Sequence, residues 1–274
     1  MKTKAEIAVG LKRSPDEALH AALSNLSGPI VPSKKMERVI IKPSIYNPKL
    51  PGNTDVELIR SLIHMFRFIG PISVVESDNP LRRTEDAFSH CNYTDLADEH
   101  IDLVDLSNSE MTSVRFPGHH FKDRKMPLVL HDGAFFINVA TLKVEPDICD
   151  VGAGIKNLFG LLPELDKSVY HPFIDDVLMD LLALYRPNLT VIDLTDVVIG
   201  ERENHRTEHL GGVIVGIDPV SVDSFCSSLL GFNSFEVNHL RMAHELGYGE
   251  ALLDRISVRG TEYQVNKLLR FFKK

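Results

Sequence analysis

The stretch Val39-Ile40-Ile41-Lys42-Pro43-Ser44 indicates the fold class of this chain. Three consecutive β-branched apolar residues are typical of a strand buried on both faces, and a proline directly after a strand ends it. A helical pattern follows, capped by Asn53 or Thr54, and residues 72–75 form the next apolar run. Buried strands that alternate with amphipathic helices predict an α/β protein with a largely parallel central sheet.

The same alternation continues in both directions along the chain. Before it, a strand at 6–10 precedes Ser14-Pro15-Asp16-Glu17, which has the form of a helix-capping box. After it, strands are expected at 135–139, 189–194 and 213–217, with helices at 154–162, 175–184, 220–230 and 234–246. We therefore expect one α/β domain over residues 1–274, with helices on both faces of the sheet. The polar stretch 80–130 is expected to form a smaller irregular lobe with a short strand at 101–106.

The composition of the chain argues against several classes of protein. The chain has 274 residues, 38 acidic and 30 basic, and a formal charge of −8, which argues against a general nucleic-acid binder. No apolar run is long enough to span a membrane, and the N-terminus lacks the apolar region of a signal peptide, so we expect a cytoplasmic protein. The three cysteines are far apart and are expected to be free thiols.

Four sequence blocks, in this order and spacing, resemble the widespread prokaryotic family known as domain of unknown function 362. The blocks are Val39-Ile40-Ile41-Lys42-Pro43-Ser44 with Pro51-Gly52-Asn53-Thr54; Val74-Val75-Glu76-Ser77; Ile155-Lys156-Asn157-Leu158-Phe159-Gly160 with Tyr170-His171; and residues 189–193 with Gly216-Ile217-Asp218-Pro219-Val220-Ser221-Val222-Asp223. The resemblance covers most of the chain and implies an α/β fold.

The chain also departs from the family pattern. Many members carry a Pro-Lys-x-Lys-Thr-His stretch after the strand at 135–139, whereas here Ala140-Thr141-Leu142-Lys143-Val144-Glu145 keeps one lysine and has no histidine. Many members also add a ferredoxin-like module with clustered cysteines, which this sequence lacks. We therefore expect no intrinsic cofactor. Redox chemistry, which the resemblance implies, would need an external iron–sulfur electron donor such as a ferredoxin-like protein.

Three lysines are expected at one edge of the sheet. Lys42, Lys143 and Lys156 each lie at or beyond a strand end or at the start of a helix, where ligands bind in open α/β sheets. Together they would form a pocket for a phosphate or carboxylate. For Lys156 we expect the free N–H groups of the helix start to meet the same anion. The alternative is that each lysine pairs with a surface carboxylate.

Other polar residues complete the predicted site. Gly52 and Thr54 precede a helix and could bind an anion, or Thr54 could simply cap that helix. Glu76 ends a strand and could orient a lysine, bind a metal or transfer a proton, and His171 is the histidine that matches a family block. The predicted catalytic residues are His171, Glu76 and Lys143. The predicted ligand-binding residues are Lys42, Ser44, Asn47, Gly52, Thr54, Lys156 and Asn157.

One motif points to a metal but is interpreted otherwise. His205-Arg206-Thr207-Glu208-His209 matches the zinc-protease string H-x-x-E-H, which requires both histidines on one helix face. The string lies between two expected strands, beside Gly211-Gly212, so we expect a solvated loop and predict no metal site. Asp218, followed by Pro219, is expected to cap the next helix.

Two classes of function follow from these residues. The first is an enzyme that acts on a small anionic metabolite, linked to redox chemistry through a separate electron donor. The second is a non-catalytic ligand-binding or accessory subunit that docks an iron–sulfur protein. The sequence leaves the substrate, the reaction and a homo-oligomeric state open.

Overall fold

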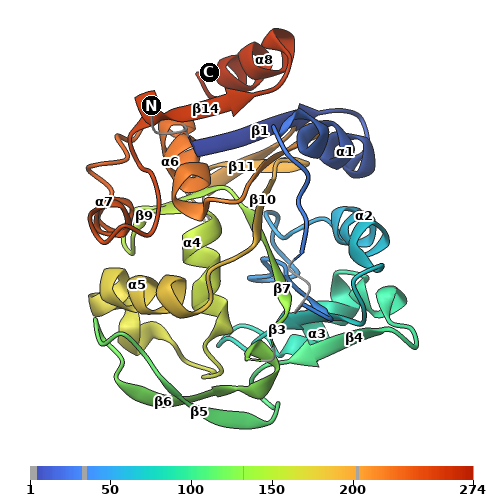
Figure 1. The fold of residues 1–274 in the computed structure, drawn as a ribbon, viewed down its shortest axis with the longest axis vertical. Coiled ribbons are helices and arrows are strands. Elements are labelled where there is room, and N and C mark those ends of the chain that lie inside the picture. Colours follow the sequence, from blue (N-terminus) through green and yellow to red (C-terminus); the bar gives the residue numbers. More distant parts are fainter. Residues whose placement is uncertain (1–4, 33–35, 132, 202–203, 274) are drawn as a thin grey trace.

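The computed structural model describes residues 5–32, 36–131, 133–201 and 204–273. Within these residues, an eight-stranded sheet forms the centre of the molecule (Figure 1). Its strand order is β14 (Ile256–Arg259), β1 (Ala5–Leu11), β13 (Gly212–Gly216), β10 (Leu189–Asp193), β7 (Phe135–Thr141), β2 (Val39–Lys42), β3 (Ile72–Glu76) and β4 (Ile101–Asp105). β13 runs antiparallel to both of its neighbours, whereas every other neighbouring pair is parallel. The predicted, largely parallel sheet is confirmed.

Helices cover both faces of this sheet, as predicted (Figure 1). On one face lie α1 (Pro15–Asn25), α2 (Val56–Phe66) and α3 (Thr84–His90), whose apolar side chains belong to one buried cluster. The other face carries α4 (Gly154–Asn157), α5 (Ile174–Leu184), α6 (Pro219–Leu229), α7 (Asn238–Glu245) and α8 (Glu262–Phe272), which contribute to a second cluster.

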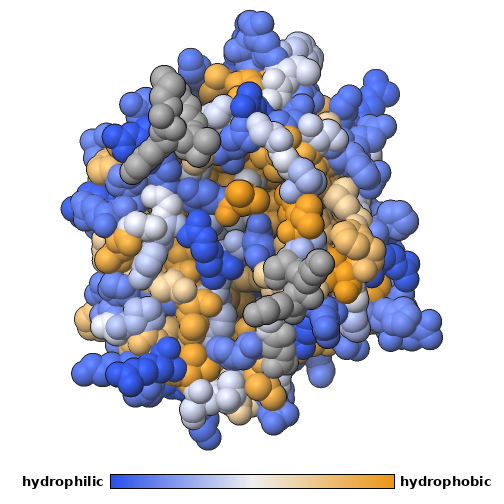
Figure 2. All heavy atoms as spheres, in the orientation of Figure 1, coloured by the Kyte–Doolittle hydropathy of each residue, from blue (hydrophilic) through white to orange (hydrophobic). Residues whose placement is uncertain are grey.

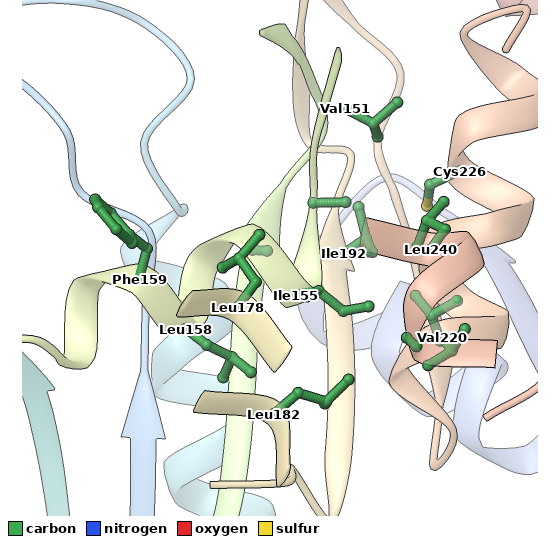
Figure 3. Close-up of a cluster of buried hydrophobic side chains, with 14 of the residues drawn as sticks. Val151, Ile155, Leu158, Phe159, Leu178, Leu182, Ile192, Val220, Cys226 and Leu240 are labelled. Carbon is green, nitrogen blue, oxygen red and sulfur yellow. The ribbon is translucent and has the colours of Figure 1, made fainter. Parts of the chain in front are cut away.

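Alternating strand residues supply both clusters, because successive side chains of a strand point to opposite faces. In β2, Ile40 packs in the second cluster, whereas Val39 and Ile41 pack in the first. Figure 3 shows part of the second cluster, where Ile155 and Leu158 lie beside Leu182 of α5. On the outside, the face drawn in Figure 2 has mostly hydrophilic side chains at its outline, with apolar ones between them nearer its centre.

Helix caps were predicted with mixed success. Ser14 accepts a hydrogen bond from the N–H of Glu17 at the start of α1, and Asp218 caps α6 as expected. The predicted cap of α2 is wrong, because Asp55 accepts the hydrogen bond from Glu57 and neither Asn53 nor Thr54 occupies that position. Thr54 instead bonds to backbone groups of other segments.

Two segments are more regular than predicted. The stretch 80–130 contains the expected short strand, as the sheet strand β4, and in addition α3 and a hairpin of β5 (Met111–Arg115) with β6 (Asp123–Pro127). The polar insert at 201–209 belongs to a second hairpin, β11 (Asp196–Glu201) with β12 (Asn204–His209), so the expected loop is wrong. Backbone hydrogen bonds between the paired strands stabilise these hairpins, although their sequences lack a clear alternation of apolar and polar residues.

Short elements complete the described chain. β8 (Lys143–Glu145) pairs with β9 (Asp150–Gly152), and the predicted helix at 154–162 ends at Asn157 and continues as a 3₁₀ turn. The 3₁₀ elements are η1 (Tyr93–Leu96), η2 (Leu128–Leu130), η3 (Leu158–Leu161), η4 (Ser168–Phe173) and η5 (Leu253–Arg255). All three cysteines are free thiols. Every helix of the described residues is too short or too polar to span a bilayer.

Candidate functional site

A cavity of about 610 Å³ lies at the carboxyl ends of β2, β3 and β7. Parallel strands place their carboxyl ends at one edge of the sheet, and ligands bind at this edge in open α/β folds. Here β2 ends at Lys42, β3 ends at Glu76 and β7 ends at Thr141, and all three residues line the cavity. The α4–η4 segment forms the facing side.

A buried ion pair lies at the base of the cavity. Lys42 Nζ is 3.0 Å from Glu76 Oε1, and Arg82 Nη2 is 3.5 Å from Glu76 Oε2. Burial alone would raise the pKa of Glu76, but Lys42, Arg82 and the Ser77 amide together lower it below its usual range. Burial lowers the pKa of Lys42, and Glu76 opposes that effect. Glu76 is therefore held as a carboxylate that orients Lys42, which is one of the roles predicted for it.

Arg82 was not singled out in the sequence, although it is a central residue of this network. Its guanidinium donates hydrogen bonds to the carbonyl oxygens of Ser77 and Ile45, in addition to its contact with Glu76. It therefore connects the loop after β2 to the loop after β3. The sequence gives two weak signals for Arg82, its position seven residues after the end of the expected strand at 72–75 and its neighbour Arg83.

Lys143 is bound among neutral oxygens. Its Nζ lies 2.8 Å from Thr141 Oγ1, 3.4 Å from the carbonyl oxygen of Gly52 and 3.5 Å from Ser44 Oγ. Ser44 in turn donates its N–H to Thr54 Oγ1 at 2.8 Å. The loop after β2 is thus connected to the strand end of β7, and Lys143 and Ser44 both line the cavity.

The backbone around Lys156 differs from the prediction. The N–H groups of Gly154 and Ile155 donate to the buried carboxylate of Asp223 at 2.8 and 2.6 Å. The start of α4 therefore already has an anion, and its N–H groups are not available to a ligand. Because α4 ends at Asn157, Lys156 lies in its last turn, where the helix dipole favours a cation. The expectation that free N–H groups beside Lys156 would meet a ligand anion is therefore wrong.

Lys156 and His171 both lie close to one aromatic ring, that of Phe159. Lys156 Nζ is 4.3 Å from the centroid of Phe159, and the ring of His171 is 5.7 Å from the same centroid. Phe159 belongs to the same buried cluster as Ile155 and Leu158, and in Figure 3 its side chain lies apart from those two. Burial and the Lys156 charge lower the pKa of His171, although Glu145 opposes them. His171 is therefore mainly neutral near pH 7 and can accept a proton.

Lys167 also lines the cavity and was missed in the sequence. Its side chain is buried, and its Nζ donates to the carbonyl oxygen of Asp78 at 2.5 Å. Burial lowers the pKa of Lys167 to about 8, with the nearby Lys42 adding to the decrease. A lysine four residues before His171 in a loop shows no periodicity, so its burial could not be read from the sequence.

The predicted site residues fall into two groups. Those that line the cavity are Lys42, Ser44, Glu76, Lys143, Lys156, Asn157 and His171. The other predicted residues, Asn47, Gly52 and Thr54, are not part of its lining. Thr54 Oγ1 bonds to Ser44 and Val139 backbone atoms, and Gly52, at a φ of 84°, presents its carbonyl oxygen to Lys143. Gly52 and Thr54 therefore shape the loop that carries Ser44, and their predicted contact with a ligand is not supported.

No group of three metal-ligating side chains forms within the described residues. The string at 205–209 lies on strand β12 and not on a helix, and His209 Nδ1 is 2.9 Å from Asp196 Oδ1 of β11. The helical arrangement that the zinc-protease motif requires is absent from this hairpin.

Comparison with known proteins places the chain in a family. A model of the family described as Domain of unknown function (DUF362) matches residues 39–228. No curated protein matches the sequence. The apoprotein of lactate racemase from Thermoanaerobacterium thermosaccharolyticum is similar in fold, with 12% identity, a TM-score of 0.47 and coverage of 76% of this chain. A protein from Thermotoga maritima has 11% identity, a TM-score of 0.40 and 78% coverage.

The chain spans 54% and 57% of the lengths of these two structures. At these identities and scores the two likenesses concern the fold, and they carry no argument about activity. The family match includes the candidate site, because residues 39–228 contain β2, the α4–η4 segment and Asp223. Since the match covers more than half of the sequence, the chain belongs to the DUF362 family.

Proposed function

We propose that this protein is an enzyme that binds a small metabolite by its phosphate or carboxylate group in the cavity. The observation that carries the proposal is the convergence of four lysines on one cavity from four separate segments of the chain. They are Lys42, Lys143, Lys156 and Lys167. Bringing several cations together in a partly buried site costs free energy, so a cluster of this kind is rarely needed for stability alone.

The charges of the cavity support an anionic ligand. Asp78 is one of the buried acidic residues of the lining. Its charge is balanced by a 2.5 Å ion pair with Arg83, which lies outside the lining. Glu76 and Glu145 then face four lysines and Arg82. Asp147 and Asp166 also line the cavity but are exposed to water, where their charges are screened. An anion of one or two charges would offset the remaining positive charge.

His171 supports chemistry beyond binding. General acid–base catalysis requires a group that changes protonation near the working pH and lies within reach of the ligand. The pKa of His171 is lowered by burial and by Lys156, and its ring lies in the same cavity as the lysines. We propose that the lysines hold the anionic group while His171 accepts or donates a proton. An external iron–sulfur electron donor for this reaction stays a prediction.

Thermal unfolding in the presence of ligands tests the binding step. A ligand that binds only the native state at a hundred times its Kd stabilises the protein by about 2.7 kcal/mol, so the midpoint rises. We would screen inorganic phosphate and small phosphorylated and carboxylated metabolites. Lys167→Met should remove most of the response. Lys267→Met, in an exposed position of α8, is the matched control and should keep it.

Turnover of the stabilising compounds, followed by NMR, tests the catalytic step. We expect His171→Gln to keep the thermal response to a substrate and to lose its turnover. Compounds that stabilise the wild-type protein and remain chemically unchanged would favour the non-catalytic alternative. A complete lack of response to anions, or an undiminished response in Lys167→Met, would contradict the proposed site.

A further inference from the structure

The cavity is much larger than the group that its lysines would bind. Its volume is about 610 Å³, which lies within the range of about 300–1,000 Å³ found for sites of drug-sized ligands. A phosphate or carboxylate group alone would occupy a small part of this space. The rest of the lining therefore determines what else the ligand carries.

Apolar side chains lie at the mouth of the cavity. Leu81 and Leu165 are part of its lining, yet their side chains are 53% and 43% exposed. Lys42 and Lys167, by contrast, are 1% and 8% exposed. The cavity is thus cationic at its base, and its opening combines the apolar side chains of Leu81 and Leu165 with the water-exposed carboxylates of Asp147 and Asp166. The cationic base and the two apolar side chains are complementary to an amphiphilic acid.

Hydrogen bonds hold these apolar residues in place. The N–H of Leu81 donates to Asn79 Oδ1 at 2.9 Å, within a tight turn that Asn79 and Arg82 close through two backbone hydrogen bonds. On the other side, Lys167, two residues after Leu165, donates to the carbonyl oxygen of Asp78. Leu81 is therefore fixed in an exposed position, and the segment that carries Leu165 is tied to the same loop.

We infer that the ligand is an organic acid with an apolar tail, whose anionic group lies among the lysines and whose tail contacts Leu81 and Leu165. This inference rests on the proposed function, since it assigns the substrate class of the same cavity. The tail would cover apolar surface that water now contacts, and its burial would add affinity in proportion to the area covered. Affinity should therefore increase with tail length, whereas the anionic group alone should bind weakly.

The test is calorimetric titration of the full chain with straight-chain monocarboxylates from acetate to octanoate. A buried methylene contributes about 0.8 kcal/mol, so each added carbon should tighten binding by roughly threefold to fourfold until the tail leaves the mouth. Leu81→Ser and Leu165→Ser should reduce this increase per carbon and leave acetate binding unchanged. Both residues are exposed, so these variants should fold normally. Leu253→Ser, 42% exposed and outside the lining, is the control.

The outcomes separate this inference from the proposed function. Wild-type affinity that is independent of chain length would overturn the inference and leave the anion site intact. A length dependence that persists unchanged in the Leu81→Ser, Leu165→Ser double variant would overturn the assignment of the tail to the mouth. If neither inorganic phosphate nor any acid of the series binds, both the inference and the proposed function are wrong.

Discussion

The cavity has two walls that use lysine in different ways. The sheet wall, formed by Lys42, Glu76 and Arg82, is almost completely buried, and its charges bind one another directly. The helix wall, formed by Lys156, Lys167 and His171, is on average more open; Lys167 donates to a carbonyl oxygen and Lys156 lies over an aromatic ring. The comparison indicates that the charges of the sheet wall stabilise one another, and under the proposed function the lysines of both walls face the ligand.

The largest effect should come from the sheet wall. Glu76→Gln would leave Lys42 and Arg82 buried without their carboxylate, and breaking a buried ion pair in this way costs about 3–5 kcal/mol. Denaturant unfolding measures the change. Glu57→Gln, which breaks the exposed pair with Arg60, is the matched control and should cost less than about 1 kcal/mol. Similar losses in the two variants would remove the structural role that we assign to the sheet wall.

An intermediate effect is expected beneath the helix wall, at Asp223. Burial raises the pKa of Asp223 to about 7, although the amides of Ile155 and Gly154 oppose it. Because this pKa lies above the usual value for an aspartate, the native state binds more protons than the unfolded state between about pH 4 and pH 7. The contribution of Asp223 to stability is therefore present at low pH and is lost as the pH rises to about 7.

Asp223→Asn removes this titration while keeping the size of the side chain. The stability difference between wild type and variant should be largest at about pH 4 and below, and should shrink by about 2–3 kcal/mol between pH 5 and pH 8. Burial also raises the pKa of Asp193 to about 6. Because Asp193 is present in both proteins, its titration contributes equally to both stabilities and cancels in the comparison. Urea unfolding at several pH values provides the measurement. A difference that grows with pH would show that the carboxylate is the form that the fold favours.

The smallest effect on stability is expected at Lys156. Lys156→Ala removes the cation above Phe159, a contact worth about 0.5–1 kcal/mol at a partly exposed site. Binding of an anionic ligand should weaken by about 1.5–3 kcal/mol, as for a lost charge-assisted hydrogen bond. Denaturant unfolding of this variant measures the change in stability, and ligand titration of the same variant measures the change in affinity. A variant that binds normally and unfolds much more easily would place Lys156 with the sheet wall.

The sequence predicted the parts of the fold that depend on local pattern. The buried strands at 39–41 and 72–75 and the cap at Asp218 could be read because apolar runs and cap residues have local physical causes. The short strand expected at 101–106 is also present, as β4. The hairpin β11–β12 could not be read, because pairing between its two strands stabilises it and leaves little trace in their own residues. The final helix α8, with its capping box at Thr261, was overlooked although its signal is local.

The residues of the candidate site also divide into those that local sequence pattern predicts and those that it does not. Lys42, Lys143 and Lys156 could be placed at one edge because strand ends converge there in a parallel sheet. Lys167 and Arg82 reach the cavity from irregular loops, whose path no periodicity describes. The anion at the start of α4 was assigned to a ligand, but it is Asp223, 69 residues away from Gly154 in the chain. A contact between such distant residues depends on the whole topology.

The reversed direction of β13 has a consequence for how this family can diversify. A parallel strand after β10 would have required the chain to return across the sheet, but β13 starts at the edge where β10 ends. The chain between β10 and β13 therefore leaves and rejoins the sheet on the side of the cavity, and it includes the β11–β12 hairpin. β11 contacts β8, the strand that begins at Lys143. The hairpin lies outside the central sheet, so insertions or deletions in it that keep Val197 in the second buried cluster would leave the register of that sheet unchanged while altering the support of the cavity wall. Related chains can thus acquire new specificity here by changes in length alone.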